Sequence, residues 1–125
     1  MTRTWTQEEL AAIAQDKKLF ISIPNSDGSM HAPTWISIVQ TGEDLYCRAY
    51  NGSSSRWYRA AQNIGHGHIS VGGVDAEVDF EFPIDTAVID RVDDAYRIKY
   101  ADSPYLQPIL GAGPRAATVR LIPAR

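Results

Sequence analysis

The segment Val74–Phe82 reads VDAEVDFEF, in which apolar and acidic residues alternate without interruption. Successive side chains of a β-strand point to opposite faces, so this pattern predicts a strand with one face in a core and the other in solvent. The apolar face would carry Val74, Ala76, Val78, Phe80 and Phe82, and the acidic face Asp75, Glu77, Asp79 and Glu81. We expect the acidic face to be solvated, where its charge opposes edge-to-edge pairing with another sheet.

Turn and capping residues divide the rest of the chain into short elements. Helices are predicted from a capping box at Thr6 and Glu9 to about Ala14, from the N-cap Ser55 over about 56–63, and from the N-cap Asp85 to about Tyr100. Further strands are predicted over 19–23, 45–50, 68–72 and 117–122, with 35–39 as a buried central strand and 103–110 irregular. These elements predict an α+β fold built on a six-stranded antiparallel, partly closed barrel with about three helices.

Length and charge limit the classes of protein that this chain can belong to. Its 125 residues suffice for one domain, which we expect to span 1–125. Twelve Lys and Arg against fifteen Asp and Glu give a net charge of −3, which argues against general nucleic-acid binding. No apolar run approaches the roughly 20 residues that cross a bilayer, and the start MTRTWTQEEL lacks the apolar core of a secretory signal. We therefore expect a cytoplasmic protein without a membrane segment.

Several chemistries find no support in the sequence. The single cysteine, Cys47, cannot close an internal disulfide and is expected to be a small core residue. His66 and His68 alternate on a predicted strand, but two ligands do not complete a metal site, so we predict none. Neither a G-x-S-x-G elbow nor a G-x-G-x-x-G loop is present, which argues against hydrolase, Rossmann and P-loop functions. No residue can be nominated as a general acid or base.

The stretch YNGSSSRWYR, Tyr50–Arg59, is the best candidate for a binding site. A helix beginning after Ser54 and Ser55 presents unpaired backbone N–H groups, and its dipole attracts an anion. Arg56 and Arg59 share a helix face, Arg48 approaches from the preceding strand, and the rings of Trp57 and Tyr58 could cover a planar ligand. The alternative is structural: Ser55 only caps the helix, Trp57 anchors it, and the arginines pair with the acidic strand.

A second group of aromatic residues follows in the last third of the chain. Tyr96, Lys99, Tyr100 and Tyr105 could roof a pocket, or Tyr96 and Tyr100 are core aromatics and Lys99 is solvated. Residues 102–114 form a candidate lid because they are irregular and contain three prolines. Tyr50, Lys99 and Tyr105 are the candidates for contact with a substrate.

Three stretches carry a resemblance to a known family: PTWISIVQTGEDLYCRAY at 33–50, SRWYRAA at 55–61 and AYRIKYADSPYLQPIL at 95–110. Their order resembles the small split-barrel proteins related to the deazaflavin-dependent nitroreductases. More closely, it resembles an uncharacterised group of bacterial domains of this length. The resemblance extends from Trp5 to Leu121 and implies a six-stranded split β-barrel, often a homodimer, that holds FMN or a deazaflavin coenzyme.

The resemblance also implies positions for the cofactor. Trp57 and Tyr58 match an aromatic pair near the cofactor, and Pro33 and Thr34 match the strand entry where the ring meets backbone. Deazaflavin-binding relatives carry basic residues before that strand, whereas residues 24–32 contain no Lys or Arg. Binding of a cofactor phosphate would then fall to Arg48, Arg56, Arg59 or backbone N–H groups.

Three functions remain open. The first, which the resemblance favours, is a flavin- or deazaflavin-dependent, nitroreductase-like oxidoreductase acting on a small organic substrate. The second is a non-redox module that has lost the cofactor and binds another small anionic or aromatic ligand. The third is self-association or contact with a partner protein through Trp5, Trp35 or exposed arginines.

Overall fold

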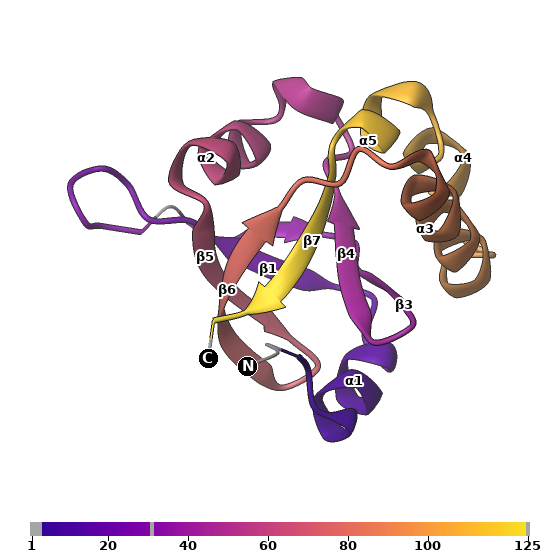
Figure 1. Cartoon of the computed structure of the whole chain (residues 1–125), viewed down its shortest axis with the longest axis horizontal. Coiled ribbons are helices and arrows are strands. Elements are labelled where there is room, and N and C mark those ends of the chain that lie inside the picture. Colours follow the sequence, from indigo (N-terminus) through magenta and orange to yellow (C-terminus); the bar gives the residue numbers. More distant parts are fainter. Residues whose placement is uncertain (1–3, 31, 125) are drawn as a thin grey trace.

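The computed structural model describes residues 4–30 and 32–124, which form one curled antiparallel sheet with helices around it (Figure 1). The strands run in the order β2-β1-β5-β6-β7-β4-β3, and each neighbouring pair is antiparallel. Their bounds are β1 Leu19–Ser22, β2 Thr34–Ile36, β3 Val39–Thr41, β4 Asp44–Arg48, β5 His66–Val71, β6 Val74–Glu81 and β7 Thr118–Pro123. The antiparallel α+β fold is confirmed.

The connection between the two edge strands explains why the sheet curls. In a flat sheet of this strand order, β2 and β3 would lie about 29 Å apart, at about 4.8 Å per strand spacing. Only Ser37 and Ile38 join Ile36 at the end of β2 to Val39 at the start of β3, and such a link reaches about 11 Å at most. The sheet must therefore bend round until its edges meet, which gives the partly closed barrel.

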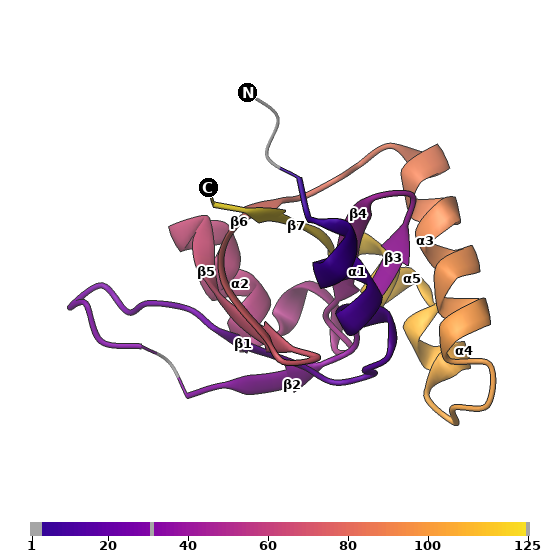
Figure 2. The same ribbon diagram turned by 90° about the horizontal axis from the view of Figure 1, so that it is seen from below.

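Five α-helices and one short 3-10 helix are found among the described residues. They are α1 Gln7–Ala14, η1 Gly52–Ser54, α2 Arg56–Ile64, α3 Thr86–Lys99, α4 Leu106–Ile109 and α5 Ala112–Ala116. Helix α1 lies at one end of the curled sheet, whereas α3, α4 and α5 lie together beside β3 and β4 (Figures 1 and 2). The predicted starts are confirmed: Thr6 and Glu9 form the capping box of α1, and the Asp85 side chain accepts from the Ala87 N–H.

Two hydrophobic clusters hold these layers together, and β4 belongs to both. Leu45 and Cys47 point into the barrel core, where they meet Ile13 of α1, while Tyr46 packs in a second cluster with Val92 of α3. The two faces of this strand therefore pack into different clusters. The alternation in β6 is confirmed, since Val78 is buried and Asp75, Glu77 and Glu81 are exposed.

The prediction of one buried central strand over 35–39 is wrong. The segment contributes to β2 and β3, both at sheet edges, and the side chain of Trp35 is 52% exposed. At the two residues between β2 and β3, tyrosine side chains provide hydrogen-bond partners in place of a neighbouring strand. The Ser37 hydroxyl shares a hydrogen bond with Tyr96, and the Ile38 N–H donates to Tyr100 Oη.

The number of elements also differs from the prediction. In the part of the chain that the structure describes, the sheet has seven strands instead of six because the 35–39 segment is divided, and there are five α-helices instead of about three. The two additional helices, α4 and α5, lie in the region predicted to be irregular or a lid. Pro114 stands in the first turn of α5, where a missing N–H costs little, so proline there does not oppose a short helix.

Candidate functional site

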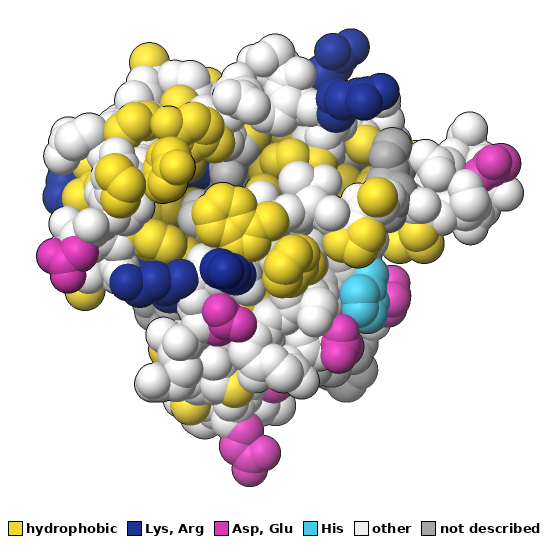
Figure 3. All heavy atoms as spheres, turned by 180° about the vertical axis from the view of Figure 1, so that it is seen from behind, with side chains coloured by type: hydrophobic (Ala, Val, Ile, Leu, Met, Phe, Trp, Pro, Cys, Tyr) yellow, Lys and Arg dark blue, Asp and Glu magenta, His cyan; other side chains and the backbone are white. Residues whose placement is uncertain are grey.

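A pocket of about 570 Å³ lies where three separate parts of the chain meet. One wall is β2 and the residue after it, the second is the stretch from the end of β4 to the start of α2, and the third runs from the end of α3 through α4. The lining residues are Thr34, Trp35, Ile36, Ser37, Arg48, Tyr50, Asn51, Ser55, Arg56, Trp57, Tyr96, Tyr100, Ser103, Tyr105, Leu106 and Ile109. Hydrophobic side chains gather around a hollow on the face of the molecule shown in Figure 3.

Aromatic rings make up most of the pocket wall. Trp35 and Trp57 lie on the sheet and α2 sides, and Tyr96 and Tyr100 lie on the α3 side with ring centroids 5.6 Å apart. At the rim the rings of Tyr50 and Tyr105 meet edge to face at 5.8 Å, and both are partly exposed. A pocket of this size and composition suits a flat organic ligand, which the rings can contact on its faces and edges.

The start of α2 gives the pocket a positive end. The first N–H groups of a helix have no carbonyl partner within the helix. Ser55 is the N-cap residue, but its side chain makes no capping bond, and the first turn contains no acidic residue. Arg56 is exposed at the pocket, and none of the carboxylates in the described part of the chain lies within ion-pair distance of it. Backbone donors, hydroxyl and guanidinium thus converge where an anionic group could bind.

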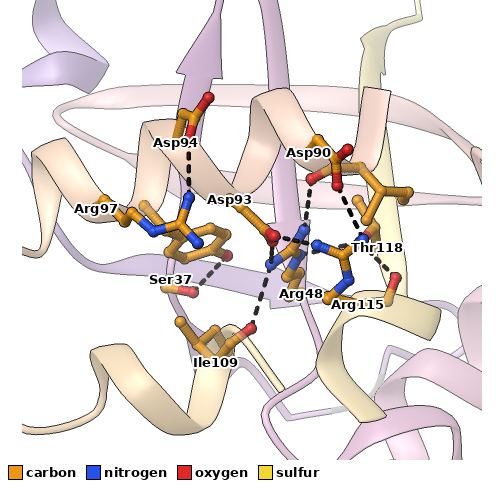
Figure 4. Close-up of polar contacts among 11 residues, drawn as sticks. Ser37, Arg48, Asp90, Asp93, Asp94, Arg97, Ile109, Arg115 and Thr118 are labelled. Carbon is orange, nitrogen blue, oxygen red and sulfur yellow. Dashed lines mark hydrogen bonds and ion pairs between the residues drawn. The ribbon is translucent and has the colours of Figure 1, made fainter. Parts of the chain in front are cut away.

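Arg48 lines the pocket, but its guanidinium group is paired with buried groups of the protein itself (Figure 4). Its side chain is fully buried, and Nη1 lies 2.6 Å from Oδ1 of Asp93 on α3. Nε donates to Thr118 Oγ1 at 3.0 Å, Nη1 to the Ile109 carbonyl at 3.2 Å and Nη2 to the Ile89 carbonyl at 3.0 Å. The charge of Arg48 is therefore balanced within the protein, and Arg56 is the predicted arginine that lines the pocket without a described carboxylate partner.

Two tyrosines of α3 have hydroxyls fixed by hydrogen bonds. Tyr96 Oη lies 2.8 Å from Ser37 Oγ, and Tyr100 Oη donates to the Lys17 carbonyl at 2.7 Å. Burial raises the pKa of Tyr96 well above its ordinary value and raises the pKa of Tyr100 to about 12. Both phenols are therefore neutral near pH 7. The residues that line the pocket include no His, Lys, Asp or Glu, so nothing described there titrates between pH 5 and 8.

The structure places the predicted site residues in two groups. Those at the pocket are Thr34, Arg48, Tyr50, Ser55, Arg56, Trp57 and Tyr105; those outside it are Pro33, Ser54, Tyr58, Arg59 and Lys99. The Ser54 hydroxyl donates to the Asn51 carbonyl at 3.0 Å. Tyr58 is buried, and its ring meets Phe82 edge to face at 5.6 Å. Arg59 is exposed without a described carboxylate partner, and Lys99 lines a separate depression.

Pocket residues missing from the predicted set come mainly from the third wall and from β2. The predicted set does not include Trp35, Ile36, Ser37, Asn51, Ser103, Leu106 or Ile109, and the sequence indicates Tyr96 and Tyr100 only as a roof or as core residues. The spacing of Tyr96 and Tyr100, one helical turn apart, was the available signal for a shared face. No local pattern indicates Ser37, because its position depends on a tyrosine of α3.

Other candidate chemistries have structural explanations. Cys47 is completely buried, and desolvation raises the pKa of its thiol, as in an unreactive core residue. His68 Nδ1 lies 2.8 Å from Glu77 Oε1 on the neighbouring strand. Over residues 4–30 and 32–124, no three His, Cys, Asp or Glu side chains are grouped so that they could hold a metal ion. In the same residues, no helix has the length and apolar character needed to span a membrane.

Comparisons with known proteins place the chain in a family and a fold. Residues 9–121 match a family described as uncharacterised protein conserved in bacteria (DUF2255). No match is found among the curated proteins.

Three solved structures share the fold at low identity. A Listeria innocua protein, provisionally assigned as a pyridoxamine 5'-phosphate oxidase, aligns with a TM-score of 0.69 at 12% identity, over 94% of this chain and 92% of its own. The conserved hypothetical protein Rv2991 of Mycobacterium tuberculosis aligns at 0.72 and 12%, over 100% and 85% of the two chains. A Bacteroides thetaiotaomicron protein, provisionally assigned to 5-nitroimidazole antibiotic resistance, aligns at 0.62 and 14%, over 95% and 79%.

Proposed function

Since the chain belongs to the family of uncharacterised proteins conserved in bacteria (DUF2255) and has a split-barrel-like fold, we propose that it binds a flavin-type cofactor, FMN or a deazaflavin, in the aromatic pocket. The proposed reaction is reduction or oxidation of a small organic substrate. The observation that carries the proposal is the combination, in one pocket, of aromatic walls with a helix N-terminus and Arg56, which has no carboxylate partner among the described residues.

The residues present fit such a group at both of its ends. The N–H groups of the first turn of α2, the Ser55 hydroxyl and Arg56 would hold the phosphate. Trp35 and Trp57 would contact the flat ring system, and the rim pair Tyr50 and Tyr105 would limit the access of water. The neutral hydroxyls of Ser37 and Tyr96 lie on the wall as hydrogen-bond donors or acceptors for the ring or a substrate.

The described pocket lining contains no acid–base group, which supports a reaction whose chemistry comes from a cofactor and not from the protein's side chains. Without a His, Lys or carboxylate there, the chain's own side chains offer no group that exchanges protons near pH 7. The cofactor would supply hydride transfer when bound. The protein would bind it, orient it and keep water away from it.

One observation favours a second candidate, a non-redox module for a small anionic or aromatic ligand. Residues 24–32 contain no Lys or Arg, and Arg48 is already paired with Asp93. The positive charge directed at the pocket is therefore that of Arg56 and the α2 N-terminus, which suits a ligand with a single anionic group. A ligand of this kind would need no redox chemistry.

We also propose a homodimer as the assembly of this protein. Residues 24–30 project from the body of the molecule (Figures 1 and 2). Exposed Met30 belongs to this arm, and exposed Phe20 and Trp35 lie opposite each other on the paired strands β1 and β2. These side chains offer a second copy an apolar surface next to the pocket mouth. Light scattering of the purified protein tests the assembly, and a monodisperse monomer at all concentrations would contradict it.

The cofactor proposal is tested by the visible absorbance of the protein as purified, followed by titration with FMN and with a deazaflavin coenzyme. Arg56→Gln and Arg59→Gln provide a matched pair, because they remove the same charge from neighbouring turns of α2 but only Arg56 lines the pocket. We expect Arg56→Gln to weaken binding by about tenfold or more and Arg59→Gln by less than about twofold.

The outcomes separate the two candidate functions. Binding of either cofactor with the expected difference between the variants supports the oxidoreductase. No binding of either cofactor to a folded, colourless protein contradicts it. A colourless protein that carries another copurified small anion or aromatic molecule, lost in Arg56→Gln, supports the binding module.

A further inference from the structure

Lys99, the last residue of α3, lies in a second depression that is separate from the aromatic pocket. This depression has a volume of about 300 Å³ and is formed where the ends of α1 and α3 meet β3. Besides Lys99, it is lined by Ile13, Ala14, Gln40, Ala95 and Ile98. The amine is thus surrounded mainly by aliphatic side chains, on a chain that has three lysines in all, at 17, 18 and 99.

The amine of Lys99 has few polar partners. Its Nζ donates to the Ile13 carbonyl at a long 3.4 Å and lies 5.9 Å from the centre of the Tyr100 ring. Among residues 4–30 and 32–124, no carboxylate lies within ion-pair distance of it. A lysine held in apolar surroundings without an ion pair loses much of the stabilisation of its charged form.

We infer that Lys99 is an acylation site, at which the side-chain amine takes a small acyl group from an activated donor, an acyl phosphate or a thioester. The neutral nitrogen attacks the carbonyl carbon and forms the C–N bond. The C–O bond to phosphate, or the C–S bond of the thioester, breaks, and the leaving group departs with the electron pair. The nitrogen releases one proton to the leaving group or to water, and the product is an amide.

The depression favours this chemistry over formation of a Schiff base. Loss of water from a carbinolamine needs a nearby acid, and neither a His nor a carboxylate is among the residues described as lining the depression. Acyl transfer from an activated donor needs only an uncharged amine and a good leaving group. The aliphatic walls leave room for a short acyl chain next to the nitrogen.

The charges around Lys99 support the presence of uncharged amine near neutral pH. The pKa of Lys99 is lowered to about 8, mainly by burial; the nearby charge of Asp16 opposes this shift, and the charge of Lys17 adds a smaller lowering to it. These two residues face Lys99 from the segment after α1, Tyr100 follows it directly after the end of α3, and β3 contributes the uncharged Gln40. Lys17 and Lys18 are exposed and serve as internal references.

The test is to incubate the full chain separately with acetyl phosphate and with acetyl-coenzyme A, and to follow acetylation of each lysine by mass spectrometry. At pH 7.5 we expect Lys99 to react about tenfold faster than Lys17 or Lys18, after allowance for the weaker nucleophilicity of a less basic amine. The Lys99 rate should level off above about pH 8. The donor that gives the larger ratio identifies the source of the acyl group.

A pair of variants makes the test specific to the depression. Gln40→Glu places a carboxylate among its lining residues and should slow Lys99 several-fold without changing the reference lysines. Gln107→Glu makes the same charge change at an exposed position of α4, outside the depression, and should leave the acetylation rate of Lys99 unchanged. Equal rates at the three lysines with both donors, or equal effects of the two variants in folded protein, would overturn the inference.

Discussion

Nη1 of Arg48 on β4 lies 2.6 Å from Oδ1 of Asp93 on α3, and both side chains are almost completely buried. The other carboxylate oxygen of Asp93 accepts from Arg115 of α5, which also binds Asp90 at 3.0 Å (Figure 4). The network joins three elements behind the pocket wall. Such a network is costly to break on one side, because the remaining charge stays buried without a partner.

We therefore expect Asp93→Asn to lower the free energy of unfolding by about 3 kcal/mol, since Arg48 would lose the charge that balances it. Asp94→Asn is the matched control, because Asp94 is exposed and pairs only on the surface with Arg97 at 2.8 Å. Its cost should stay below about 0.5 kcal/mol. Urea unfolding measures both values, and similar losses for the two variants would refute a special role for the buried pair.

The hydroxyl of Tyr100 is a second point where the pocket wall is attached to the sheet. It accepts from the Ile38 N–H at 3.0 Å and donates to the Lys17 carbonyl at 2.7 Å. Tyr100→Phe should cost about 1–3 kcal/mol, because these backbone groups lose their partner. Tyr105 also lies at the pocket, but this residue is 59% exposed. The Tyr105→Phe substitution should therefore lower the free energy of unfolding by less than about 0.5 kcal/mol. Thermal unfolding of both variants checks the difference.

The Gly72–Gly73 turn between β5 and β6 gives a test of backbone packing. Both residues have positive φ, +58° and +81°, but a Cβ on Gly72 would lie 2.8 Å from the carbonyl carbon of Ala12, whereas a Cβ on Gly73 would meet nothing within 4 Å. Gly73→Ala should cost about 1 kcal/mol from the backbone conformation alone. Gly72→Ala should cost at least about 1 kcal/mol more, because α1 must move away. Equal unfolding midpoints would contradict this contact.

His68 should make stability depend on pH in a defined direction. The hydrogen bond to Glu77 is the largest cause that raises the pKa of His68 above its ordinary 6.5, and Asp75 adds to it. A raised folded-state pKa contributes stability that is complete below about pH 6.5 and is lost as the pH rises through the raised value. The stability of the wild type relative to His68→Gln should therefore decline from pH 6 to pH 8.

The size of this effect is limited by solvent, because the His68 and Glu77 side chains are 35% and 69% exposed. We expect a few tenths of a kcal/mol, about what exposed pairs contribute. Glu77→Gln should remove most of the pH dependence. If the free energy of unfolding of the wild type relative to His68→Gln stays constant or grows as the pH rises, the contact between His68 and Glu77 does not persist in solution.

Features encoded within a few residues could be predicted from the sequence. The capping box at Thr6 and Glu9 and the alternation in β6 each depend on neighbours in the chain, and the structure confirms them. Strand and helix positions follow from such local patterns.

Features that depend on distant partners could not be predicted. The break between β2 and β3 arises where Ser37 and Ile38 bond to tyrosines 59 and 62 residues away. From the sequence, Arg48 is a candidate for binding an anion, because it lies just before the stretch Tyr50–Arg59. Its partner Asp93 is far away in the chain and reaches it only when α3 packs against β4. Lys99 belongs to a tyrosine-rich stretch, but it lines another depression than the pocket that Tyr105 lines.

The pocket walls come from stretches around residues 34–37, 48–57 and 96–109, which meet only after the sheet has bent round. An occupant of the pocket would therefore bind the native chain and not the unfolded one, and mass action would raise the melting temperature of the whole protein. At a hundredfold excess over its dissociation constant, a ligand would add about 2.7 kcal/mol. Heat denaturation can thus rank candidate small molecules before any reaction has been assayed.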